Sequence, residues 1–287
     1  MRPRLIARLD IKGPDLVKGI HLEGLRTLGT PGAFARHYYE AGIDELIYQD
    51  IVASLYQRNS LHAFIQATAR DAFIPLTVGG GLRSIDDIRA VLRAGADKVA
   101  LNTAAVANPD LVREASRVFG SSTIVVAIEA IRQPDGRYLA STDCGREMTN
   151  LEVVAWAQHA ERLGAGEILL TSVDREGTGQ GFDLALTAAV SNAVGIPVIA
   201  HGGAGHPEHL AAAIVEGGAD ALAVASMLHY STLESLAGDS RGAIEGNQEF
   251  LKSGGRHARF SGHSVPSLKE ALRSAGVAMR PPSLVTT

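Results

Sequence analysis

Cysteine is almost absent from this sequence, since Cys144 is the only one in 287 residues. No disulfide within the chain and no cluster of thiolate metal ligands can therefore form. Long apolar runs are also absent, because none approaches the roughly 18 residues of a membrane-spanning helix. The first ten residues lack the apolar core of a secretion signal. We therefore expect a cytosolic protein that does not bind a membrane.

Neither sign of charge is in large excess. Lysine and arginine number 27, aspartate and glutamate 31, and the formal net charge is −4. Without a basic field, nucleic acid is not an expected partner, and positive charge for an anionic substrate must be local. The ten histidines show no metal-ligand spacing. We predict neither a metal nor a cofactor.

Eight short apolar stretches recur at intervals of roughly 30 residues. They are continuously apolar rather than alternating, which is typical of strands buried on both faces of a parallel sheet. Segments with helical spacing lie between them, for example around Ile88 and in the stretch Leu151, Val154, Ala155 and Ala160. A (β/α)8 barrel fits best, with a doubly wound open sheet as the alternative. The predicted strands are 5–10, 46–50, 75–78, 98–101, 124–129, 167–172, 197–200 and 221–224.

The chain repeats itself after about 122 residues. IPLTVGGG (74–81) returns as IPVIAHGG (196–203), and GADKVALNT (95–103) returns as GADALAVAS (218–226). This period is far longer than that of a solenoid. We therefore predict a single barrel domain over residues 1–280. It divides into half-barrels of about 1–120 and 121–237, an insertion at 238–264, a final helix at 265–280 and a tail at 281–287.

Two carboxylates end equivalent strands in the two halves, Asp10 and Glu129. Active sites of such barrels lie at the carboxyl ends of the strands. A facing pair suits general acid–base catalysis, although a carboxylate there can also cap the following helix. Other polar residues end the remaining strands: Asp50, Asn102, Thr103, Ser172, Asp174 and Ser226.

Glycine clusters follow two of the predicted strands. Gly80 and Gly81 belong to the first cluster, and Gly202 and Gly203 form the second. Glycine lets backbone N–H groups approach an anion closely, so the duplicated clusters predict two phosphate sites; turn formation is the alternative. In the repeat, Asn102 and Thr103 occupy the places of Ala225 and Ser226. Lys18 could add positive charge there or simply face solvent.

Four charged residues of alternating sign start predicted strands at the opposite mouth of the barrel. They allow either a stabilising closure of the bottom or a gated polar plug. These residues are Arg4, Glu45, Lys98 and Glu167.

Together these segments resemble the cyclase subunit of imidazole glycerol phosphate synthase, of histidine biosynthesis. The similarity covers about residues 4–237 and 265–280. The motifs that carry it are RLIARLDIKG…LVKG (4–19), AGIDELIYQDI (41–51), PLTVGGG (75–81), GADKVALNTAA (95–105), VVAIEA (125–130), GAGEILLTSVDREGTGQGFD (164–183), IAHGGAG (199–205) and the final SLKEALRSAGVAMR.

The resemblance implies a twofold-symmetric barrel that closes the ring of a bisphosphorylated formimino-aminoimidazole carboxamide ribotide with ammonia. The implied products are imidazole glycerol phosphate and aminoimidazole carboxamide ribotide. A glutaminase subunit on the N-terminal mouth would supply the ammonia through a gate of Arg4, Glu45, Lys98 and Glu167. Asp10 would be the base, with Glu129 as the second carboxylate and Lys18 assisting. Glu176 and Gly177 belong to the second phosphate loop.

Several positions depart from the family pattern. Glu129 and Glu176 stand where the family has aspartate, His201 replaces a serine, and Arg8 replaces a small cysteine. The insertion at 238–264 is foreign to the compact form. A divergent member that only channels ammonia in a sugar-modifying amidotransferase complex is therefore an alternative. The sister sugar-phosphate isomerase of the same pathway is a third.

Overall fold

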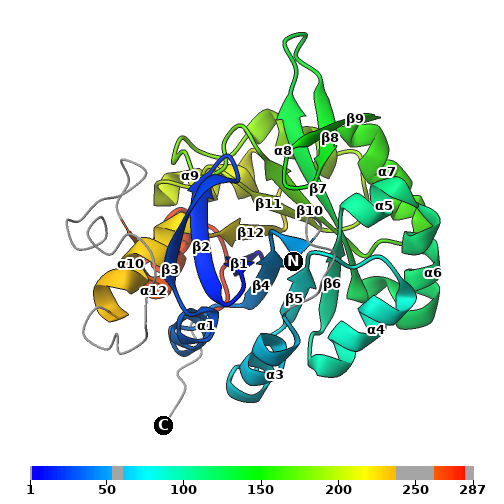
Figure 1. Ribbon diagram of the computed structural model, residues 1–287. Coiled ribbons are helices and arrows are strands. Elements are labelled where there is room, and N and C mark those ends of the chain that lie inside the picture. Colours follow the sequence, from blue (N-terminus) through cyan, green and yellow to red (C-terminus); the bar gives the residue numbers. More distant parts are fainter. Residues whose placement is uncertain (1, 54–60, 237–261, 282–287) are drawn as a thin grey trace.

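A closed barrel of eight parallel strands forms the centre of the protein (Figure 1). The computed structural model describes residues 2–53, 61–236 and 262–281. The strands follow one another in chain order around the barrel, and the last pairs with the first. The predicted (β/α)8 barrel is therefore confirmed, and the open sheet is excluded. The barrel strands are β1 (Arg4–Lys12), β4 (Glu45–Asp50), β5 (Leu76–Gly79), β6 (Lys98–Leu101), β7 (Ile124–Arg132), β10 (Glu167–Ser172), β11 (Val198–His201) and β12 (Ala221–Val224).

Helices cover the outside of the barrel. Local interactions set both ends of α4: the Ser84 side chain accepts a hydrogen bond from the Asp87 N–H at the start, and Gly95 adopts φ 120° at the end. The described helices are α1 (Pro31–Glu40), α3 (His62–Asp71), α4 (Ile85–Ala94), α5 (Thr103–Ala107), α6 (Asp110–Phe119), α7 (Val153–Leu163), α8 (Leu184–Ser191), α9 (Pro207–Val215), α10 (Ser226–Leu236) and α12 (Val265–Ser274), with a 3-10 turn, η1 (Ser121–Thr123).

The hydrophobic core has two layers. The larger layer lies between the strands and the surrounding helices. The smaller one fills the inside of the barrel, so the lumen is packed rather than open. Its fully buried members are Ile6, Ile47, Ala100, Val125, Leu169, Ile199, Ala221 and Ala223.

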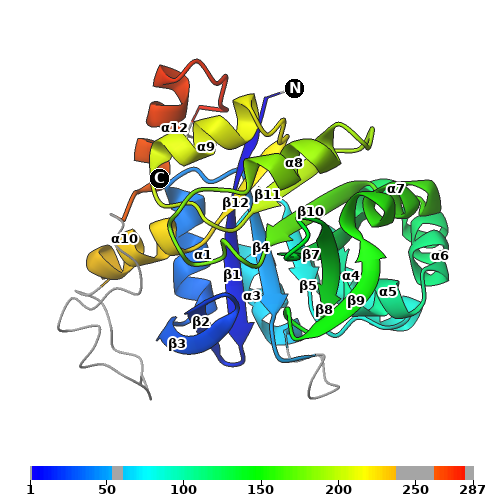
Figure 2. The same cartoon turned by 90° about the horizontal axis from the view of Figure 1, so that it is seen from above.

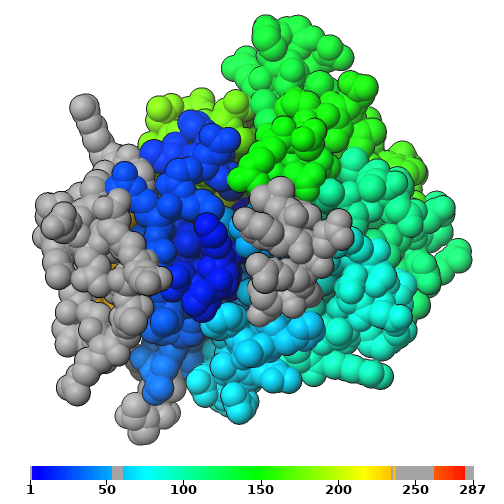
Figure 3. Space-filling model, in the orientation of Figure 1, coloured from blue at the N-terminus to red at the C-terminus, as the bar shows by residue number. Residues whose placement is uncertain are grey.

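Two hairpins that we did not predict extend the barrel at its C-terminal mouth. β1 continues into β2 (Asp15–Ile20) and β3 (Glu23–Gly29), and β7 continues into β8 (Tyr138–Thr142) and β9 (Glu147–Glu152). Both hairpins lie at the same end of the molecule, opposite the N-terminus (Figure 2). On the face shown in Figure 3, the N-terminal strands are blue, and the β8–β9 hairpin lies in the green region above them.

Two boundary predictions were wrong. Leu151 lies in β9 rather than in a helix, because Glu152 caps α7 by accepting a hydrogen bond from the Ala155 N–H at 2.9 Å. The final helix ends at Ser274, and Gly276 adopts φ 83° just beyond it. Residues 237–261 and 282–287, which include most of the predicted insertion and tail, lie outside the described residues.

No helix in the described ranges is long and apolar enough to cross a membrane. The residues that the structure describes also hold no group of three or more histidine, cysteine, aspartate or glutamate side chains placed to bind a metal ion.

Candidate active site

A closed ring of ion pairs occupies the N-terminal mouth. Arg4, Glu45, Lys98 and Glu167 are the first residues of β1, β4, β6 and β10. Arg4 Nη1 lies 2.8 Å from Glu45 Oε1 and 3.2 Å from Glu167 Oε1. Lys98 Nζ lies 2.8 Å from Glu167 Oε1 and 3.4 Å from Glu45 Oε2. The structure thus brings all four predicted residues together as one ring of alternating charge.

The two predicted carboxylates lie at the other mouth, Asp10 on β1 and Glu129 on β7. Both are buried: Asp10 is 3% exposed and Glu129 is 8% exposed. Only Glu129 lines the main cavity. Because their surroundings differ, the pKa values of the two carboxyl groups shift in opposite directions.

Asp10 is held between two cations. Arg8 Nε donates to Asp10 Oδ1 at 2.9 Å, and Lys18 Nζ lies 3.8 Å from Asp10 Oδ2. Burial acts to raise the pKa of Asp10, but the opposing charges of Arg8 and Lys18 outweigh it and lower the pKa below its usual value. Lys18 also pairs with Glu176, which in turn accepts a hydrogen bond from the Leu22 N–H at 3.0 Å. Asp10 is therefore a buried, ionised carboxylate.

The Glu129 carboxyl group has fewer favourable contacts than Asp10 to offset the loss of hydration on burial. Its Oε2 accepts a hydrogen bond from the Gly145 N–H at 2.9 Å, and Ser141 Oγ donates to its backbone carbonyl. Burial raises the pKa of Glu129 to about 7, against the lowering effect of Arg8. The structure thus holds one carboxyl group ionised and keeps another able to carry a proton near neutral pH.

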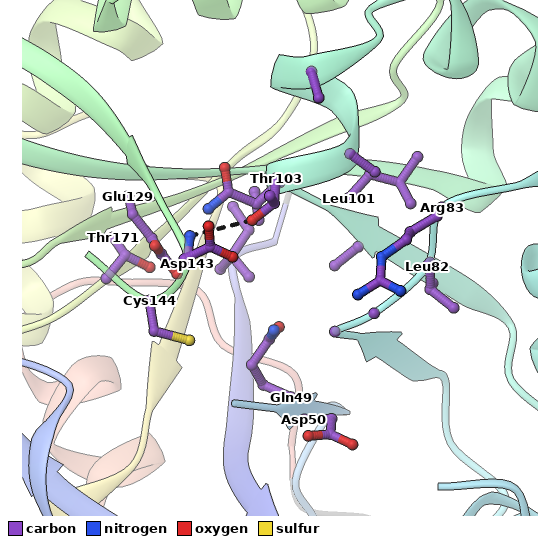
Figure 4. Close-up of a pocket in the computed structure, with 18 of the residues that line it drawn as sticks. Gln49, Asp50, Leu82, Arg83, Leu101, Thr103, Glu129, Asp143, Cys144 and Thr171 are labelled. Atoms are coloured by element: carbon purple, nitrogen blue, oxygen red, sulfur yellow. Dashed lines mark hydrogen bonds between the residues drawn. The ribbon is translucent and has the colours of Figure 1, made fainter. Parts of the chain in front are cut away.

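A cavity of about 500 Å³ opens at the C-terminal mouth, with Glu129, Thr171 and Cys144 on one side and Arg83 on the other (Figure 4). Predicted binding residues from the first half of the chain line it together: Asp50, Gly80, Gly81, Asn102 and Thr103. Gly80 adopts φ 103°, and a Cβ there would lie 2.2 Å from the Asp50 carbonyl oxygen, so only glycine fits.

A second, smaller pocket lies on the opposite side of Asp10. It is lined by Lys18 of the first half and by predicted residues of the second half: Glu176, Gly177, Gly202, Gly203, Ala225 and Ser226. Gly203 adopts φ 102°, and a Cβ there would lie 2.1 Å from the Gly181 carbonyl oxygen. Helix α10 begins at Ser226, so its N-terminus meets this pocket. Because Asp10 bonds to Arg8 of the cavity and contacts Lys18 of the pocket, it stands between the two.

Two predicted binding residues line neither space. The Asp174 carboxylate accepts a hydrogen bond from the Arg132 N–H at 2.8 Å and so braces β7. Ser172 is buried at the end of β10, and its Oγ has no hydrogen-bond partner among the described residues.

The structure adds cavity residues that the sequence analysis did not select: Arg83, Asp143 and Cys144. Arg83 lies two residues after the glycine cluster, so the sequence could have indicated it as a cavity residue. The Asp143 N–H donates to Thr103 Oγ1 at 3.2 Å, linking the β8–β9 turn to the cavity wall (Figure 4). The Pro134–Asp135–Gly136 turn sequence, which lies between β7 and β8, was a signal that β7 continues into a hairpin.

Comparisons with known proteins agree with this geometry. The family described as "Histidine biosynthesis protein" matches residues 4–234. The chain is 59% identical over 205 residues to the "Imidazole glycerol phosphate synthase subunit HisF" of Legionella pneumophila, covering 71% of this chain and 97% of that relative. It is 52% identical over 226 residues to the protein of the same name from Myxococcus xanthus (strain DK1622), covering 79% and 89%.

The chain belongs to the HisF family. The predicted resemblance is therefore confirmed, and the cyclase subunit is favoured over the sister isomerase. Both relatives are named as subunits.

Proposed function

We propose that the chain is an ammonia-dependent cyclase subunit of imidazole glycerol phosphate synthase. It joins a bisphosphorylated formimino-aminoimidazole carboxamide ribotide to ammonia and releases imidazole glycerol phosphate and aminoimidazole carboxamide ribotide. The observation that carries this proposal is the place of Asp10, between a cavity and a pocket that each contain a glycine-rich loop. A substrate with a phosphate at each end would lie across Asp10.

The protonation states of the two carboxyl groups support this chemistry. Ammonia must lose protons as it forms bonds to carbon, and cleavage of a carbon–nitrogen bond needs a proton for the leaving nitrogen. In this proposal Asp10, which is ionised, accepts a proton, and Glu129, whose pKa is raised to about 7, donates one. A base and an acid kept apart by different surroundings can act at the same pH.

The phosphates would be held by backbone N–H groups. Gly80 and Gly81 would hold one end of the substrate beside Asn102 and Thr103. Gly202 and Gly203 would hold the other end, near the N-terminus of α10.

A glutaminase subunit would dock on the N-terminal mouth and deliver ammonia through the charged ring. The ring supports this proposal because four ion pairs among Arg4, Glu45, Lys98 and Glu167 close the mouth. Shifting one of these side chains would open the ring toward the apolar interior of the barrel. The chain would then work as one half of a heterodimer.

Steady-state turnover with ammonium salt and the bisphosphorylated substrate tests the proposal. Wild-type protein should release both products, and Glu129→Gln should reduce the turnover strongly. If the wild type binds the substrate without turnover while Glu129→Asp is active, the wild-type chain is an ammonia-channelling subunit instead.

A further inference from the structure

The Arg8 side chain lies where the barrel lumen opens into the cavity. It belongs to β1, is 3% exposed, and lines the cavity together with Ala127, Leu169 and Thr171. Leu169 belongs to the packed interior of the barrel, and Ala127 packs against it. Ammonia that travels along the barrel axis would therefore meet the cavity beside this guanidinium group.

Three side chains fix the Arg8 guanidinium. Its Nε donates to Asp10 Oδ1 at 2.9 Å. Its Nη1 lies 3.2 Å from Thr171 Oγ1 and 3.1 Å from His201 Nδ1. Because a guanidinium only donates hydrogen bonds, His201 Nδ1 must be an acceptor, and the imidazole is uncharged. Burial, with Arg8 and Lys18 nearby, lowers the pKa of His201 well below its usual value, in agreement.

The third guanidinium nitrogen of Arg8, Nη2, is available to bind a substrate atom. The bonds just described use Nε and Nη1, and Nη2 makes no hydrogen bond with the residues that the structure describes. A guanidinium keeps its charge at all ordinary pH values and carries two N–H donors on Nη2. The Asp10, Thr171 and His201 contacts thus present a fixed, charged donor at the floor of the cavity.

A purely structural role explains this arrangement poorly. A buried ion pair contributes little net stability, because the loss of hydration offsets the attraction between the charges. Catalytic sites, in contrast, gain from donors that are already oriented toward the atom on which charge develops.

We propose that Arg8 is a catalytic residue that donates from Nη2 to the ketone oxygen of the substrate's phosphoribulosyl group. When the ammonia nitrogen forms its bond to the ketone carbon, the carbonyl π electrons move onto that oxygen, and Arg8 stabilises the negative charge. The oxygen later takes up two protons, which balance the two that the attacking nitrogen loses, and leaves as water when the carbon–nitrogen double bond forms. This proposal rests on the cyclase function proposed above and adds a residue to it.

The kinetic test compares Arg8→Met with Arg8→Lys, using ammonium salt and the bisphosphorylated substrate. Arg8→Met should lower kcat by about 100-fold or more, the usual loss for an oxyanion donor. KM should change far less, and Arg8→Lys should recover part of kcat. Equal kcat values for wild type and Arg8→Met would overturn the proposal while leaving the cyclase function intact. No turnover by the wild type would overturn the cyclase function itself, and the Arg8 role with it.

A rescue experiment separates catalysis from structure. Arg8→Ala should regain turnover when guanidinium is added at concentrations too low to unfold the protein, and urea should not replace guanidinium. Lys269→Ala is the matched control, because Lys269 is also a buried cation paired with an aspartate, Asp44, at the opposite end of the barrel. Guanidinium should not raise its turnover. Equal effects of guanidinium on both variants, or none on Arg8→Ala, would overturn the proposal.

If Arg8→Ala does not fold, Thr171→Val supplies the same information, since it removes one anchor of the guanidinium and keeps the volume. Turnover should fall severalfold with substrate affinity unchanged. A Thr171→Val variant with wild-type kcat would show that the fixed orientation has no catalytic value.

Discussion

The backbone N–H of Gly145 donates a hydrogen bond to Glu129 Oε2 across 2.9 Å. Gly145 lies in the turn between β8 and β9, so this bond connects the hairpin to the Glu129 carboxyl group that lines the cavity. Aspartate is shorter by one methylene and would withdraw from Gly145. We expect Glu129→Asp to lower kcat by about tenfold to 100-fold, because small misplacements of a reacting group are costly. Turnover with ammonium measures this, and an unchanged kcat would show that the contact has no catalytic value.

The buried Glu129 should make stability fall as pH rises. Its pKa is raised from 4.5 to about 7, so between these values the folded protein holds a proton that the unfolded chain releases. The free energy of unfolding therefore decreases through this window, by about 3 kcal/mol. Glu129→Gln carries no charge and should lack this decrease. Urea unfolding of both proteins at pH 4.5, 6 and 8 tests it, and a stability difference that is constant across pH would contradict it.

The charged ring should matter only when ammonia arrives through the barrel. Lys98→Met leaves Glu45 and Glu167 with Arg4 as their sole partner in the ring. With the glutaminase subunit present, we expect glutamine-dependent turnover to fall several times more than turnover with added ammonium. The ratio of the two rates, measured on one preparation, decides this. An equal loss in both assays would mean that the ring only stabilises the barrel.

The glycine loop at the cavity should not tolerate a side chain. Gly80→Ala would place a Cβ against the Asp50 carbonyl and should weaken substrate binding by about tenfold or more. Gly136→Ala is the matched control, because Gly136 also has a left-handed backbone, at φ 88°, but has open space around it. Calorimetric binding of the substrate compares the two. Equal losses would assign the effect to backbone strain alone.

Lys269 anchors the last helix to the barrel. Its Nζ donates to Asp44 Oδ1 at 2.6 Å and to the Gly42 carbonyl oxygen at 2.7 Å, and the side chain is fully buried. Lys269→Met leaves Asp44 with only the Leu5 N–H as donor among these contacts. We expect a loss of about 3 kcal/mol in the free energy of unfolding. Adding Asp44→Asn should recover part of it, and additive losses in the double variant would contradict the pairing.

The sequence was enough to predict the barrel because its strands are buried on both faces. Such strands are continuous apolar runs, and all eight lie where those runs are. The β8–β9 hairpin was missed because Glu147–Glu152 is largely exposed and polar, and carries no such signal. The turn before it also uses left-handed backbone at Asp143 and Cys144, which are not glycine.

Candidate site residues were predictable where they end strands or repeat between halves. The glycine loops meet both conditions, whereas the residues of the charged ring were predictable because they start strands at the opposite mouth. The role of Arg8 was not predictable, because its partners Thr171 and His201 lie on strands more than 160 residues away in sequence. Only the closure of the barrel brings them together.

The most direct test of the account is the turnover of purified wild-type protein with ammonium salt and the bisphosphorylated substrate, beside Asp10→Asn. We predict that the wild type releases imidazole glycerol phosphate and aminoimidazole carboxamide ribotide in equal amounts. Asp10→Asn should bind the substrate but turn it over at least about 100-fold more slowly. A wild type that binds the substrate and releases neither product would contradict the account.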